Sequence, residues 1–117
     1  MSHTVNIDIK MDDMTALKAA CKRLGLTMKD GTHKLYGSTE TGIGINLKGW
    51  TYPVVLKKDG TVSYDNYNGS WGKQKELDAL KQIYGVEKAK KEARKKGYMV
   101  SEKKNAKTGE IKLTINL

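Results

Sequence analysis

Apolar and polar residues alternate near the start of the chain, where every second residue from 5 to 9 is Val or Ile. This pattern predicts a half-buried strand. The next apolar residues recur at three- and four-residue spacing, which places them on one side of a helix. They are Met14, Leu17, Cys21 and Leu24. We expect Asp12 or Asp13 to cap this helix and Gly25 to end it, because glycine tolerates a positive φ.

Glycines interrupt the pattern between residues 26 and 49. We expect two short strands there, at residues 34–36 and 43–47, around a loop. Residues 52–56 and 61–64 are rich in β-branched and aromatic types and flank the dipeptide Asp59-Gly60. Asp-Gly between two such runs is a strong hairpin signal.

Residues 73–96 are helical in composition, but their apolar positions fall on two nearly opposite faces of a straight helix. The two sets are Leu77, Leu80 and Tyr84, and Val86, Ala89 and Ala93. Either the helix breaks at Gly85, or one long helix is covered on different sides at its two ends. We favour a break or bend, because glycine inside a helix costs about 1 kcal/mol.

The pattern at the end of the chain predicts a hairpin. Residues 98–102 and 111–117 are β-rich and flank the turn residues 105–109. The sequence therefore predicts one α+β domain over residues 1–117, in the order β-α-β-β-β-β-α(α)-β-β, with an antiparallel β-sheet and the helices packed on one face. The sheet is expected to include residues 5–9, 52–56, 61–65 and 111–116.

Positive charge is concentrated in the second half of the chain. Residues 73–107 hold twelve Lys or Arg against five Asp or Glu, so this segment carries +7 of the net charge of +9. A surface of this kind attracts polyanions. The cations that we expect on the open side of the helix, with Ala89 and Ala93 facing the sheet, are Lys88, Lys91, Arg94 and Lys95. The alternative is a solvated helix face with i,i+4 pairs such as Glu87–Lys91.

Three aromatic residues precede this basic segment, namely Tyr64, Tyr67 and Trp71. Exposed aromatic rings beside a basic groove hold single-stranded nucleic acid in many proteins, because bases stack on them. The alternative, which we favour for Tyr64 and Trp71, is burial in the core, since a chain without Phe must bury its other large rings.

Other chemistry has little support. With only Cys21, His3 and His33 among the usual soft ligands, the chain cannot supply a closed zinc site of four Cys or His, and we expect no metal or other cofactor. No nucleophile elbow or phosphate-binding loop motif is present, so we expect no enzymatic activity. Cys21 is expected to be buried and unreactive, and a single cysteine excludes an internal disulfide. The absence of a ~20-residue apolar run or a secretory signal predicts a cytoplasmic protein without a membrane partner.

Both ends of the chain resemble a small family known as hypothetical chloroplast reading frame thirty-five, a domain of unknown function in plastids, cyanobacteria, other bacteria and bacteriophages. At the start the resemblance rests on Met1-Ser2-His3, Leu17-Lys18-Ala19-Ala20 and Leu24-Gly25. Further on it rests on Leu77, Gln82, Tyr84, Glu92, Lys95, Gly97-Tyr98 and Gly109-Glu110-Ile111-Lys112-Leu113. The chain departs from the family in a shorter, glycine-richer segment 26–50 and in a more basic long helix. The resemblance implies a fold and no catalytic residue.

Two functions follow as expectations. The first is a non-enzymatic basic protein that binds a polyanion, RNA or single-stranded DNA. The second is a protein-interaction module, which would be either an adaptor of an AAA-type ATPase or a phage protein that engages a host factor. The first of these follows from the resemblance, because some members of the family are encoded near such an ATPase. A small enzyme ranks last, and the oligomeric state is left open.

Overall fold

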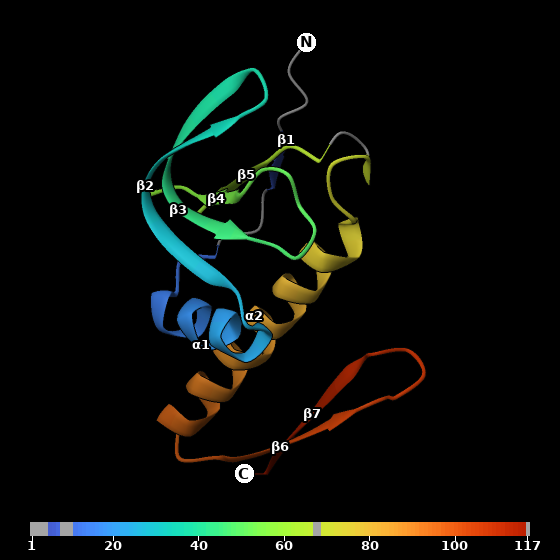
Figure 1. Cartoon of the computed structure of the whole chain (residues 1–117). Coiled ribbons are helices and arrows are strands. Elements are labelled where there is room, and N and C mark those ends of the chain that lie inside the picture. The colour runs from blue at the N-terminus through green and yellow to red at the C-terminus, as the bar shows by residue number, and fades with distance from the viewer. Residues whose placement is uncertain (1–4, 8–10, 67–68, 117) are drawn as a thin grey trace.

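The computed structural model describes residues 5–7, 11–66 and 69–116, with side chains from residue 11 onward. These residues form seven strands and two helices in the predicted order, so the α+β class is confirmed (Figure 1). The elements are β1 (Val5–Ile7), α1 (Met14–Leu24), β2 (Thr27–Leu35), β3 (Ser38–Asn46), β4 (Val54–Leu56), β5 (Val62–Tyr64), α2 (Gln74–Lys95), β6 (Met99–Lys104) and β7 (Ile111–Asn116).

Strands β1 to β5 form one antiparallel sheet in the order β1-β5-β4-β3-β2. The hairpin predicted at Asp59-Gly60 is confirmed. The Asp59 carboxylate accepts hydrogen bonds from the backbone N–H and the hydroxyl of Thr61, at 2.9 and 2.6 Å. Gly60 adopts the positive φ of 88° that this turn requires.

Strands β2 and β3 are much longer than the two short strands expected at residues 34–36 and 43–47. They pair without interruption from Thr27 opposite Asn46 to Leu35 opposite Ser38. The glycines that interrupt the sequence pattern lie within this hairpin, and at least one of them is needed for packing. A Cβ at Gly42 would lie 2.0 Å from the carbonyl oxygen of Leu56 in β4. Glycine at this position therefore marks a close approach of two backbones.

Both helices pack on one face of the five-stranded sheet, as predicted. Asp13 caps α1 by accepting a hydrogen bond from the N–H of Ala16 at 3.1 Å, and Gly25 ends the helix with φ at 70°. In the expected stripe, Leu17 and Cys21 are buried, whereas Leu24 at the helix end is 36% exposed. The core beneath the sheet combines Leu17, Ala20 and Cys21 of α1, Leu77, Leu80, Ile83 and Tyr84 of α2, and Ile45, Val54, Leu56, Val62 and Tyr64 of the strands.

The prediction of a break at Gly85 is wrong, because α2 is one continuous helix of 22 residues. Its first half buries Leu77, Leu80 and Tyr84 under the sheet. Its second half buries Val86 and Ala93 on the nearly opposite side. Gln82 lies on that same side and donates a hydrogen bond from Nε2 to the carbonyl oxygen of Gly109 at 3.0 Å. Thus the helix is covered by different partners at its two ends.

The partner of the second half is a separate two-stranded sheet formed by β6 and β7, here called the ribbon (residues 99–116). The prediction that residues 111–116 join the main sheet is therefore wrong, and Ala89 and Ala93 lie on the side of α2 that faces the ribbon. Ile111 packs against the main core, and Leu113 is only half-buried. Figure 1 shows the ribbon below the helices, apart from the five-stranded sheet.

Candidate nucleic-acid interface

The predicted cations lie in the second half of α2, where Figure 1 shows the helix running past α1 and away from the five-stranded sheet. Residues 77, 80, 84, 88, 91 and 95 are spaced by three or four, so they form one continuous stripe along the helix. This stripe is apolar under the sheet and becomes basic beyond Tyr84. We call Lys88, Lys91 and Lys95 the basic face of α2.

Lys91 is neutralised by Asp13, the residue that caps the start of α1. Its Nζ donates to both carboxylate oxygens of Asp13, each at 3.0 Å. The N–H of Ala16 and then Lys91 hold the pKa of the Asp13 carboxyl below its usual value. The hydroxyl of Tyr84 also accepts a hydrogen bond from the N–H of Asp13 at 3.0 Å. Lys91 therefore helps to fix the start of α1, and the expected Glu87–Lys91 pair is replaced by a pair between Glu87 and Lys90.

The other three predicted cations have no ion pair within the described part of the chain. Lys88 is half-buried, and Lys95 and Arg94 are exposed. Arg94 lies toward α1 and lines a hollow of about 320 Å³ with Thr15, Ala16, Ala19, Glu87, Lys90 and Lys91. The structure thus places Lys88 and Lys95 on one open face with Lys91, and it places Arg94 at the edge of that face.

The aromatic residues do not join this basic face. Tyr64 is buried and packs edge-on against Trp50, with ring centroids 5.7 Å apart. Trp71 is half-buried between Tyr36 and Tyr52, with centroid separations of 5.2 and 5.6 Å. Tyr67 lies outside the described residues. Because α2 rises 1.5 Å per residue, Lys88 lies roughly 20 Å along the axis from the start of the helix, near which Trp71 is placed.

A second basic surface, which the sequence pattern alone did not indicate, lies on the ribbon. The register places Lys103 directly opposite Lys112 and Ser101 directly opposite Thr114, and all four side chains are exposed. The alternation of residues 111–117 showed a polar side of one strand. Only the pairing with β6 shows that a second set of polar side chains lies beside it.

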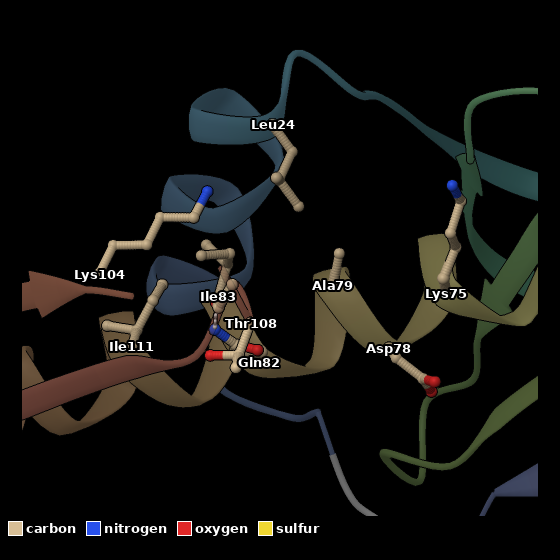
Figure 2. Close-up of a pocket in the computed structure, with 10 residues that line it drawn as sticks. Leu24, Lys75, Asp78, Ala79, Gln82, Ile83, Lys104, Thr108 and Ile111 are labelled. Carbon is tan, nitrogen blue, oxygen red and sulfur yellow. Dashed lines mark hydrogen bonds between the residues drawn. The ribbon is translucent and has the colours of Figure 1, made fainter. Parts of the chain in front are cut away.

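An apolar groove of about 320 Å³ separates α2 from the tip of the ribbon. Figure 2 shows Leu24 of α1, Ile83 of α2 and Ile111 of β7 around this groove, with Lys75 and Lys104 toward opposite ends. Its lining contains no nucleophile beside a base and no pair of carboxylates. It therefore lacks the side-chain arrangement that general acid–base or nucleophilic catalysis uses.

The structure describes two of the remaining candidates, Cys21 and His33, whereas His3 lies outside the described residues. Burial raises the pKa of the Cys21 thiol to about 11, and the side chain is 1% exposed. His33 lies on β2, where its ring packs over Gly44 and its Nε2 lies 2.9 Å from the carbonyl oxygen of Lys29. Within residues 5–7, 11–66 and 69–116, no three His, Cys, Asp or Glu residues are grouped so that they could hold a metal ion.

Comparisons with protein-family models, with curated proteins and with solved structures found no match to this chain. The resemblance to the chloroplast reading frame family therefore stays a hypothesis. Neither helix in the described part of the chain is both long and apolar enough to cross a membrane.

Proposed function

We propose that this chain is a non-enzymatic basic protein that binds a polyanion, RNA or single-stranded DNA, through the basic face of α2. One observation carries the proposal: the stripe that is apolar under the sheet becomes basic beyond it, and Lys88 and Lys95 on it have no ion pair in the described part of the chain. A continuation of the core would have been apolar, and a purely solvated face would pair its charges along the helix.

Two of the acidic residues nearby support this reading, because they are paired with other cations. Glu102 pairs with Arg23 and Lys90, and Asp13 pairs with Lys91. Lys88, Lys95 and the edge residue Arg94 form no ion pair in the described part of the chain, and Glu92 is the acidic residue one turn from both lysines. Neutralising phosphates with such side chains releases condensed counterions, which provides sequence-independent affinity. Stacking on Tyr64 is not part of the proposal, because its ring is buried.

The test is fluorescence anisotropy with short labelled single-stranded RNA and DNA between about 50 and 200 mM salt. The double variant Lys88→Ala/Lys95→Ala should weaken binding to all sequences alike. The slope of log affinity against log salt concentration should become less steep by about one to two units. Lys91 is left unchanged, because its loss would also disturb the start of α1. Both substituted positions lie outside the core cluster, so stability should change by only about 0.5 kcal/mol.

The matched control is Lys29→Ala/Lys34→Ala, which removes the same charge from two exposed positions on β2. It should retain most of the affinity. Equal losses in the two double variants would show that net charge alone, and not the α2 surface, attracts the ligand. Absence of binding at low salt would refute the proposal.

A protein-interaction module is the second candidate. The observation that favours it is the groove of Figure 2, where Leu24 keeps 36% of its surface exposed beside Ile83 and Ile111. Exposed apolar surface of this kind marks many protein contacts. If nucleic acid does not bind, a Leu24→Asp variant that loses co-purifying partners from the native host would support this candidate instead.

A further inference from the structure

The ribbon presents one of its two faces to the helices. Along β6 and β7, alternate side chains point to opposite sides. Glu102 accepts hydrogen bonds from Arg23 Nη1 at 3.0 Å and from Lys90 Nζ at 3.2 Å. Ile111, on the same side, packs against the main core. These contacts, together with the bond from Gln82 to the tip of the ribbon, define its inner face.

The outer face is left to solvent, and its composition is one-sided. All six of its side chains are exposed, and none is acidic. They are Met99, Ser101, Lys103, Lys112, Thr114 and Asn116. One further lysine, Lys107, lies at the tip, and Glu110 is the acidic residue that lines a hollow there with Lys103 and Lys112. This face is therefore positively charged and rich in hydrogen-bond donors and acceptors.

The pairing of Lys103 with Lys112 is unfavourable for the ribbon by itself. Like charges directly opposite on an antiparallel pair destabilise it, and neither lysine has an ion pair within the described part of the chain. An anion bound on this face would relieve the repulsion. A pair of lysines in this position is easier to explain by a ligand than by the stability of the fold.

The dimensions of the ribbon indicate which polyanion fits. The major groove of B-form DNA is about 12 Å wide and admits a two-stranded β-ribbon. The A-form major groove of duplex RNA is too narrow for side chains to read. Lysine, serine, threonine and asparagine can reach phosphates or base edges, and Met99 can contact a thymine methyl group.

We propose that the outer face of the ribbon enters the major groove of duplex DNA. Lys103 and Lys112 bind phosphates or guanine edges, and Ser101 and Thr114, the next outward-facing pair along the ribbon, contact the neighbouring base edges. This inference extends the proposed function to a second surface, and it rests on that function only in taking nucleic acid as the ligand. Because the ribbon packs on the side of α2 opposite the basic face, one surface can be changed without touching the other.

The experiment compares three labelled probes of one sequence: duplex DNA, duplex RNA and single-stranded DNA. The wild-type chain should bind duplex DNA more tightly than duplex RNA. Lys103→Ala/Lys112→Ala should weaken binding to duplex DNA roughly tenfold at low salt and flatten its salt dependence by about two units. Lys29→Ala/Lys34→Ala and Lys88→Ala/Lys95→Ala should change the affinity for duplex DNA by less than about threefold.

A stability readout separates a ligand role from a structural one. Because the substitution removes a repulsion, Lys103→Ala/Lys112→Ala should melt at the same temperature as the wild-type chain or higher. Ser101→Ala/Thr114→Ala should leave the salt dependence unchanged and reduce the preference among duplex sequences.

The inference is overturned if duplex RNA binds as tightly as duplex DNA, or if the β2 control loses as much affinity as the ribbon variant. It is also overturned if the ribbon variant binds like the wild type. If only the α2 variant loses binding, and only to the single-stranded probe, the proposed function is supported and the ribbon inference is not. If only the ribbon variant loses binding, and only to the duplex probe, the ribbon inference is supported and the proposed function is not.

Discussion

The indole ring of Trp50 lies directly on the backbone of Gly72. A Cβ placed at Gly72 would come within 2.4 Å of Cδ2 and 2.5 Å of Cγ of that ring. The indole Nε1 donates a hydrogen bond to the carbonyl oxygen of Lys73 at 3.1 Å, and the ring also packs in a T-shaped arrangement with Tyr64. This contact joins the loop after β3 to the start of α2.

Gly72→Ala should therefore lower the free energy of unfolding. The added methyl group must displace a packed ring, and overpacking of this kind costs about 1–3 kcal/mol. Chemical denaturation measures the loss. In a Trp50→Ala background the same substitution should cost much less, because the ring that it meets is gone. An equal cost in both backgrounds would contradict the contact.

Gly85→Ala should have the opposite effect. Gly85 is exposed in the middle of α2, and a Cβ there would meet nothing within 4 Å. Alanine in a helix interior is more favourable than glycine by about 0.5–1 kcal/mol, so the free energy of unfolding should rise by that amount. Destabilisation would indicate that the helix bends at this position.

Glu102 should make the stability of the chain depend on acid pH. Arg23 first, and then Lys90, lower the pKa of its carboxyl from 4.5 to about 2. A carboxyl whose pKa is depressed by folding stabilises the fold above its unfolded pKa and loses that contribution as pH falls through the folded value. The stability difference between the wild-type chain and Glu102→Gln should be constant above pH 4.5 and should disappear between pH 4.5 and about 2.

Denaturation curves at a series of pH values measure this difference. The matched control is Glu110→Gln, at an exposed residue of the ribbon that has no ion pair in the described part of the chain. Its stability should stay close to that of the wild type throughout. A Glu102→Gln difference that persists at pH 2 would show that the side chain acts through packing and not through its charge.

Cys21 should react with thiol reagents only after unfolding. The side chain is 1% exposed, and burial raises the pKa of its thiol to about 11. At about pH 8 only about one thiol in a thousand would be a thiolate even if the reagent could reach it. Labelling should be slow in buffer and rapid in denaturant. Fast labelling of the native chain would place Cys21 at an accessible surface.

Parts of the fold were predictable because the information is local. The alternation around residues 5–9 and the Asp59-Gly60 turn led to β1 and to the β4–β5 hairpin. The cap at Asp13 and Gly25 gave the bounds of α1. For the candidate site, the cations of α2 were recognised from their spacing. The partners of Lys90 and Lys91 were not, since Glu102 and Asp13 are distant in sequence.

The sequence by itself determined the element types and their order, because side-chain periodicity and turn chemistry act over a few residues. The tertiary structure decided three other things: α2 runs through Gly85, β2 and β3 form one long hairpin, and β6 and β7 form a ribbon apart from the main sheet. The two hairpins depend on cross-strand pairing, and the continuity of α2 and the place of the ribbon depend on contacts between segments far apart in the chain. The free energy gained by packing α2 between two sheets exceeds the unfavourable helix propensity of one glycine. No local sequence pattern shows which of these two terms is larger.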